Sequence, residues 1–191
     1  MSNRFRAGFT LVELMVTIAI LAVLTMVAIT SYKYYVRRAR AQEGKNLLLE
    51  IKMKQEHYFS TYTSYVDTAS SESTLYPGST QHPKTANGTP DTTMYDWSTM
   101  DCTSPSTQTL GWCALGVRPQ GPTYFRAVTL GWNKAKGSTP PSSSYGIVSN
   151  MNFTKRWYYA AVHGDMDEDG TMSTFIITSQ AREIVEINAM E

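Results

Sequence analysis

The sequence contains few of the groups on which enzymes depend. It has three histidines, His57, His82 and His163, and they lie far apart along the chain without a recognisable motif around them. The G-x-S-x-G, H-E-x-x-H, phosphate-loop and dinucleotide-binding patterns are absent from the sequence. We therefore expect a protein that is not an enzyme.

Charge of either sign is also scarce. Asp, Glu, Lys and Arg make up 17% of the chain, and the formal net charge is +1. A protein that binds nucleic acid through bulk charge carries a large basic excess, so the composition gives no evidence for specific nucleic-acid binding. Low charge together with abundant Ser, Thr and Tyr is typical of an extracytoplasmic surface.

Cysteine occurs only twice, as Cys102 and Cys113. This pair could close a small loop if the domain is exported to an oxidising compartment. A metal-binding pair or a catalytic thiol are the alternatives, but neither has supporting histidines nearby in the sequence. The spacing and the missing histidines favour a disulfide.

One long apolar run stands out against this polar background. It spans 21 residues from Phe9 to Ile29, and Glu13 is its only charged residue. A helix of that length measures about 31 Å, enough to cross the hydrocarbon core of a bilayer. An ionised carboxylate costs about 2.5–3.5 kcal/mol at the bilayer centre and less near its surface. Such a charge usually has a partner and a function.

The start of this run carries a motif. Residues 8–16 read Gly-Phe-Thr-Leu-Val-Glu-Leu-Met-Val and follow a basic leader that contains Arg4 and Arg6. They resemble the N-terminal signature of type IV pilins and the related pseudopilins of secretion systems. The resemblance implies that a prepilin peptidase cuts after Gly8 and that Phe9 becomes the N-methylated first residue. It also implies that Glu13 compensates the N-terminal amine of a neighbouring subunit, since buried opposite charges must meet to offset their desolvation.

Two simpler interpretations explain less. An ordinary secretory signal has an apolar region of about 7–15 residues followed by a small-residue cleavage site, whereas this run is longer and no such site follows before Tyr32. A plain membrane anchor would leave Gly8 and Glu13 unexplained. The resemblance therefore favours a structural subunit of a type IV pilus, acting in motility or cell adhesion. The alternatives are a low-abundance minor pilin in adhesion or assembly, and a type II secretion pseudopilin.

The same resemblance implies location and partners. Before assembly the chain is expected in the inner membrane as a single-pass protein with a cytoplasmic N-terminus, and afterwards in an extracellular pilus. The partners are the inner-membrane assembly platform and copies of itself and other pilins in a helical filament. Removing Met1–Gly8 would leave 15 basic and 16 acidic residues, a net charge of −1. Basic residues after the run, such as Arg37 and Arg38, would favour the opposite orientation, but long domains are translocated largely regardless of flanking charge.

The rest of the sequence predicts an α+β fold, in which one long N-terminal helix packs on a C-terminal antiparallel sheet. No proline interrupts residues 31–62, apolar residues recur at helical spacing from Leu47 to Tyr62, and Gly44 is the one weak helix former. The expected parts are a leader (1–8), a membrane-spanning or filament-core helix (9–31), an amphipathic helix half (32–65), a connecting loop region (66–123) and a sheet region (124–191).

Four β-branched or aromatic runs bounded by turn formers indicate the strands. They lie at residues 124–130, 156–162, 173–178 and 183–187. The Cys102–Cys113 segment and residues 136–144 are expected to be loops. The connections between the last three of these strands are short. This favours an antiparallel sheet that packs against the amphipathic half of the helix.

An acidic loop at residues 165–173 is the second candidate site. Asp165, Asp167 and Asp169 alternate before Gly170, which is the beginning of a calcium-loop pattern. The Thr171 carbonyl and the Ser173 hydroxyl occupy the next ligand positions, but Ile176 replaces the closing glutamate. The alternative is an acidic turn in which the Asp side chains bond their own backbone. His163 comes just before the loop, but imidazole is a poor ligand for calcium, so we do not count it among the ligands. We expect it at the surface of a strand end.

Overall fold

The computed structural model describes residues 9–77, 95, 97–98, 100–133, 141–166 and 171–188. The leader, His82 and most of the predicted 136–144 loop lie outside these residues. The chain divides into two compact units, Met1–Arg38 and Ala39–Glu191, and each is described by itself. The fold is α+β, as the sequence predicts.

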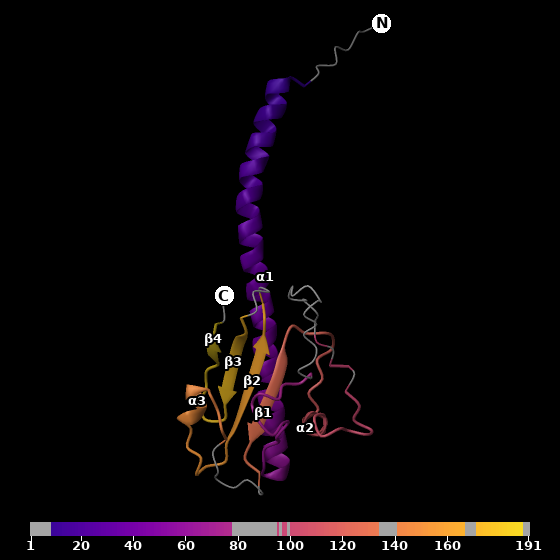
Figure 1. Cartoon of the computed structure of the whole chain (residues 1–191), viewed down its shortest axis with the longest axis vertical. Coiled ribbons are helices and arrows are strands. Elements are labelled where there is room, and N and C mark those ends of the chain that lie inside the picture. The colour runs from indigo at the N-terminus through magenta and orange to yellow at the C-terminus, as the bar shows by residue number, and fades with distance from the viewer. Residues whose placement is uncertain are drawn as a thin grey trace. The chain divides into compact units, whose positions relative to one another are not determined.

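A single helix, α1, spans Leu11–Tyr62 and contributes to both units (Figure 1). It contains no proline, and it ends where Thr63 adopts a positive φ of 54°, a conformation that a helix cannot continue through. In the first unit its large apolar side chains, from Phe9 to Tyr35, are all at least 52% exposed. By length and composition α1 is suited to cross a membrane, the one such helix among the described residues.

The second unit contains a four-stranded antiparallel sheet in the order β1-β2-β3-β4. The strands are β1 (Arg126–Gly131), β2 (Tyr158–Gly164), β3 (Ser173–Thr178) and β4 (Val185–Ile187). All four predicted strands are confirmed, with bounds that shift by two residues or fewer. β4 is the shortest strand and is largely exposed, because it lies at an edge and pairs with β3 alone.

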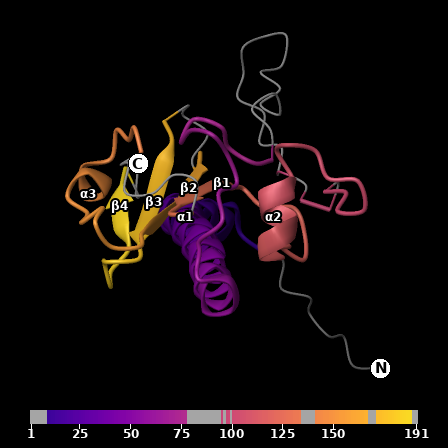
Figure 2. The same ribbon diagram turned by 90° about the horizontal axis from the view of Figure 1, so that it is seen from below.

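The amphipathic half of α1 packs on one face of the sheet (Figure 2). Leu47, Leu48 and Ile51 enter a core formed with alternate residues of the strands. Gln55 is fully buried there, and its amide is hydrogen-bonded to both backbone groups of Val66. Satisfying these groups removes the cost of burying the polar side chain.

Gly44 corrects a prediction about the helix. The sequence indicates a weak point, yet α1 continues through this residue without interruption. A Cβ placed on Gly44 would lie 2.8 Å from two ring carbons of Phe125. The glycine is therefore a close-approach position, which allows the helix to lie directly against the Phe125 side chain.

The opposite face of the sheet is also covered. Short helix α3 (Gly146–Ser149) and its flanking residues pack there with Val128, Leu130 and Ile176. The free edge of β1 is covered by the segment after α1, since Tyr76 and Ala127 exchange two backbone hydrogen bonds of 2.7 and 2.8 Å. Covering an edge strand prevents pairing with other chains.

The connecting region is more ordered than the sequence suggests. Residues 110–115 were expected within a surface loop, but they form helix α2 (Leu110–Leu115) on the β1 side of the sheet. Trp112 of α2 and Trp97 are each 1% exposed, and their ring centroids lie 5.2 Å apart. The sequence analysis missed this helix because six residues, fewer than two turns, are too short for periodicity to reveal.

Candidate functional site

The N-terminal end of α1 holds Glu13 in a reciprocal set of hydrogen bonds. The Thr10 backbone N–H and hydroxyl both donate to Glu13 Oε2, at 2.9 and 2.8 Å, and the Glu13 N–H donates to Thr10 Oγ1 at 3.3 Å. This is a capping box, in which Thr10 caps the helix and the glutamate reaches back to it. The T-x-x-E spacing was readable in the sequence, and the sequence analysis did not use it.

The capping box leaves part of the carboxylate available. Both bonds from Thr10 end on Oε2, and Oε1 has no hydrogen bond to any residue that the structure describes. Phe9, the predicted first residue of the processed chain, is 82% exposed. Gly8, the predicted cleavage position, lies outside the described residues. The carboxylate is thus satisfied locally and can still accept a donor from another molecule.

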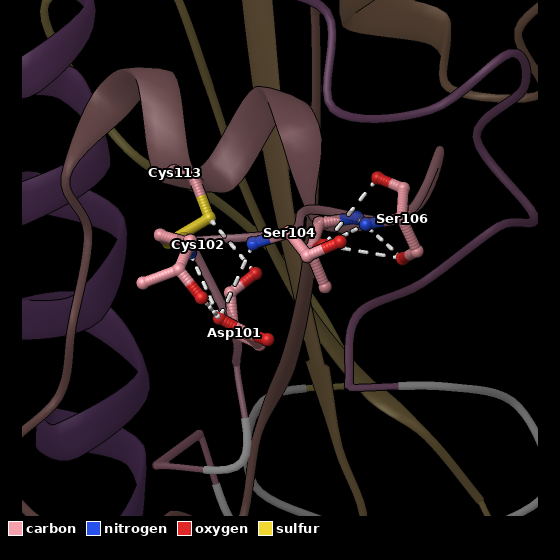
Figure 3. Close-up of a disulfide and its surroundings, with 7 residues drawn as sticks. Asp101, Cys102, Ser104, Ser106 and Cys113 are labelled. Carbon is pink, nitrogen blue, oxygen red and sulfur yellow. Dashed lines mark hydrogen bonds between the residues drawn. A yellow bond between two sulfur atoms is a disulfide. The ribbon is translucent and has the colours of Figure 1, made fainter.

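The two cysteines form the predicted disulfide, with Cα atoms 5.6 Å apart (Figure 3). Cys113 belongs to α2, and Cys102 lies within a turn that Asp101 organises. Asp101 Oδ1 accepts hydrogen bonds from the Thr103 hydroxyl at 2.7 Å and the Thr103 N–H at 2.8 Å. These bonds lower the pKa of Asp101, since they favour its charged form.

The turn before α2 is held in a similar way. The Ser106 N–H donates to Thr109 Oγ1 at 2.8 Å, and the Thr109 N–H donates to Ser106 Oγ at 3.3 Å. Together with the disulfide, these bonds fix Thr107 and Gln108, whose side chains are exposed. The Cys102–Cys113 segment is therefore a rigid surface feature anchored in the core by Trp112.

The acidic loop connects β2 to β3, because Gly164 and Ser173 form the last pair of their ladder. Of the predicted ligands, Asp165, Thr171 and Ser173 are described, whereas Asp167 and Asp169 lie outside the described residues. The Ser173 hydroxyl is buried and donates to the Asn188 carbonyl at 2.7 Å. Among described residues there is no group of three or more His, Cys, Asp or Glu side chains that could hold a metal. A calcium site in this loop stays a prediction.

An arginine from α1 supports one end of this loop. Arg40 Nη1 donates to the Met166 carbonyl at 2.7 Å, and the guanidinium lies 4.2 Å from the ring centroid of Tyr124. Met166 itself is buried in the core. The beginning of the acidic loop is thus attached to the helix as well as to the sheet.

His163 does not lie on an exposed strand end, which corrects the prediction. It is half-buried in β2, where Nε2 lies 2.8 Å from the Tyr145 hydroxyl and Nδ1 lies 3.0 Å from Thr174 Oγ1. Burial, reinforced by the nearby Arg126 guanidinium, lowers the pKa of His163 to about 4. The imidazole is neutral at physiological pH and connects the segment before α3 to the sheet.

Comparison with known families agrees with the geometry of the N-terminal helix. A model described as the prokaryotic N-terminal methylation motif matches residues 3–29. A second model, described as type IV minor pilin ComP, DNA uptake sequence receptor, matches residues 30–110. The chain belongs to the type IV pilin family. Type IV pilins are structural proteins rather than enzymes, as the missing catalytic motifs suggest.

Individual relatives support this assignment. Fimbrial protein EcpC of Eikenella corrodens is 38% identical over 31% of this chain and 39% of its own length. Type IV major fimbrial protein FimA of Dichelobacter nodosus (strain VCS1703A) is 38% identical over 44% of this chain and 53% of its own length. Type IV major pilin protein PilA of Myxococcus xanthus (strain DK1622) is 35% identical over 35% of this chain and 30% of its own length. The pilin chain thus spans about half or less of these relatives, and no solved structure matches it.

Proposed function

We propose that this pilin is a minor subunit of a type IV pilus and that its second unit, Ala39–Glu191, which we call the head, binds DNA. The observation that carries the proposal is the match of residues 30–110 to the family of a minor pilin described as a DNA uptake sequence receptor. That match includes the amphipathic half of α1 and the connecting region as far as the start of α2. The low net charge does not oppose it, because binding depends on the local arrangement of charge and not on its sum.

The proposed assembly route begins in the inner membrane. A prepilin peptidase cuts after Gly8, Phe9 is methylated, and the apolar half of α1 stays in the bilayer until the assembly platform extracts it. The methylation-motif match over residues 3–29 and the exposed apolar side chains support this route. In the filament core, Glu13 accepts the N-terminal amine of a neighbouring subunit through the oxygen that Thr10 leaves available.

A major structural subunit is the second candidate. The names of the FimA and PilA relatives favour it, since both are major pilus proteins. The same names favour a pilus over a secretion pseudopilin. Abundance separates the two pilus candidates, because a major subunit forms the filament itself.

Quantitative mass spectrometry of filaments sheared from cells tests the proposal. We expect the mature chain to begin at methylated Phe9 and to be present far below the main pilin, and deletion of its gene should leave filaments intact while DNA uptake is lost. A copy number equal to that of the main pilin, or loss of all filaments on deletion, would show a major subunit instead.

A further inference from the structure

An open groove of about 790 Å³ lies between the segment after α1 and the segment that leads into α2. One wall is formed by residues 64–70, and the other is formed by Thr107, Gln108, Leu110 and Gly111. The second wall is the one that the disulfide and the Ser106–Thr109 bonds hold in place. The groove is therefore shaped by fixed elements before any partner arrives.

Uncharged hydrogen-bonding groups line this groove. The hydroxyls of Tyr58, Ser64, Ser70 and Thr107 and the amide of Gln108 make no side-chain hydrogen bond to another residue in the described part of the chain. Hydroxyl and amide side chains are common donors to the phosphate and sugar oxygens of DNA. A solvent-facing groove with such donors can hold an extended polar ligand.

The acidic side chain in the groove is already engaged. Asp67 Oδ1 accepts the Gly131 N–H at 2.8 Å, and Oδ2 accepts the Asn133 amide at 2.8 Å. These two donors compensate part of its charge and direct the carboxylate toward the end of β1. The repulsion that Asp67 would exert on an anion is reduced accordingly.

The positively charged side chain of Arg156 lies near the groove, on the Phe59 ring that stacks against a groove residue. The Arg156 guanidinium is 5.3 Å from the ring centroid of Phe59 and 5.1 Å from that of Trp132. The Phe59 ring stacks on Tyr65, which lines the groove, at a centroid distance of 4.5 Å. Arg156 and the neighbouring Lys155 are exposed, and neither forms an ion pair with another described residue.

We propose that this groove seats the sugar–phosphate ridge of one strand of a DNA duplex and that Arg156 binds a phosphate at its end. The inference rests on the proposed function and adds the surface that would perform it. The two aromatic rings near Arg156 restrict the position of its guanidinium, so less side-chain freedom is lost on binding. Gln108 and the hydroxyls then fix the position of the strand without adding charge.

Binding of a fluorescent duplex oligonucleotide to the full chain in detergent tests this placement. Arg156→Gln should weaken binding about tenfold and reduce the slope of log K against log [salt] by about 1, since one phosphate contact is lost. Gln108→Ala should weaken binding about threefold and leave the slope unchanged, because the group is neutral. Arg182→Gln is the matched control, as Arg182 is exposed but makes no cation–π contact among described residues. Removing the charge of Arg182 should change the affinity for DNA by less than about twofold.

The outcomes separate the two proposals. If the unmodified chain binds no DNA, the proposed function fails. If it binds DNA but Arg156→Gln and Arg182→Gln weaken binding equally, the groove is not the site while the function stands. If the chain bound single-stranded oligonucleotide but no duplex, the proposal that the groove binds duplex DNA would also be wrong. Thermal unfolding of each variant, followed by fluorescence of the buried tryptophans, should match that of the unmodified chain, because Gln108, Arg156 and Arg182 are all exposed.

Discussion

At the scale of single residues, Glu13 caps the helix with Thr10 and is proposed to compensate an amine, and substitution can separate the two roles. Glutamine at this position preserves the capping box, because its side chain can still accept the Thr10 N–H. It cannot compensate the charge of an amine. We expect Glu13→Gln and Glu13→Ala to enter the membrane normally and to lower incorporation into filaments at least about tenfold, since an unpaired buried amine is strongly unfavourable. Immunoblots of membrane and sheared-filament fractions measure both quantities.

Thr10→Ala is the control for the capping role. It removes the hydroxyl bonds while leaving the charge of Glu13, and a lost cap costs about 1 kcal/mol. Incorporation should fall less than with Glu13→Gln. Normal incorporation of Glu13→Gln together with failure of Thr10→Ala would show that capping alone explains the glutamate.

His163 gives the head a defined dependence on pH. The native pKa of His163 is about 4, whereas the unfolded value is 6.5. Between about pH 6.5 and pH 4, the unfolded chain binds a proton at His163 that the native chain does not bind. The free energy of unfolding therefore decreases as the pH is lowered through this range. At about pH 5 this difference amounts to about 2 kcal/mol. The groups that face the imidazole are Tyr145, Thr174, Arg126 and Glu72.

Urea unfolding of the full chain in detergent, followed by tryptophan fluorescence, measures this dependence. The unmodified chain should lose about 2 kcal/mol more than His163→Gln between about pH 7.5 and pH 5. Glutamine can still donate and accept hydrogen bonds but does not titrate in this range. Parallel losses in the two proteins would assign the pH dependence to other groups.

At the scale of elements, the contact between α1 and the sheet depends on Gly44. Gly44→Ala improves helix propensity by about 1 kcal/mol, but its methyl group would lie 2.8 Å from the Phe125 ring. Overpacking of a core costs about 1–3 kcal/mol, so we expect a net loss of about 1 kcal/mol. A smaller side chain at position 125 should relieve this overpacking. In a double-mutant cycle, the stability losses of Phe125→Leu and Gly44→Ala should therefore sum to more than the loss of the double variant.

Gly121→Ala is the matched control for this substitution. A Cβ at Gly121 meets no atom within 4 Å, and stability should change by less than about 0.5 kcal/mol. If Gly44→Ala stabilises the head instead, the Phe125 ring can move to make room for the methyl group. The close contact with Phe125 would then not be the reason for a glycine at position 44.

The long elements were predictable because each carries its own periodic signal. The helix from Leu11 to Tyr62 and the four strands follow from apolar spacing, and the disulfide follows from two isolated cysteines. The remainder depends on contacts between distant residues. Trp97 and Trp112 meet through a segment without periodicity, α2 has fewer than two turns, and His163 is covered by Tyr145 from a separate loop. No local pattern encodes such pairings.

The acidic loop between β2 and β3 is the element whose chemistry stays a proposal. If Asp165, Asp167 and Asp169 bind calcium, the ion binds only the native chain and stabilises it. Chelator should then lower the melting temperature of the full chain in detergent by several degrees at millimolar calcium, and Asp167→Ala should abolish the difference. Identical melting curves with calcium and with chelator would show an acidic turn held by its own hydrogen bonds and by Arg40.

At the scale of the whole molecule, the two units suit different surroundings. Residues 11–35 expose apolar side chains, as suits a helix that is covered by lipid or by other apolar helices. The second unit buries large aromatic side chains such as Trp97, Trp112 and Trp157. Under the proposed function, membrane storage and filament assembly would depend on the first unit, and recognition of DNA on the second.

The near-zero net charge makes a last prediction about DNA. After removal of the leader the chain carries 15 basic and 16 acidic residues, so long-range attraction of a polyanion is weak. Binding at the groove through Arg156 and Lys155 would neutralise about two phosphates, which gives a slope of log K against log [salt] near −2. Affinity should then fall only about 15-fold between 50 and 200 mM salt. A slope steeper than about −5 in fluorescence anisotropy titrations of the full chain would require many more basic contacts than this surface offers, and it would move the site elsewhere on the head.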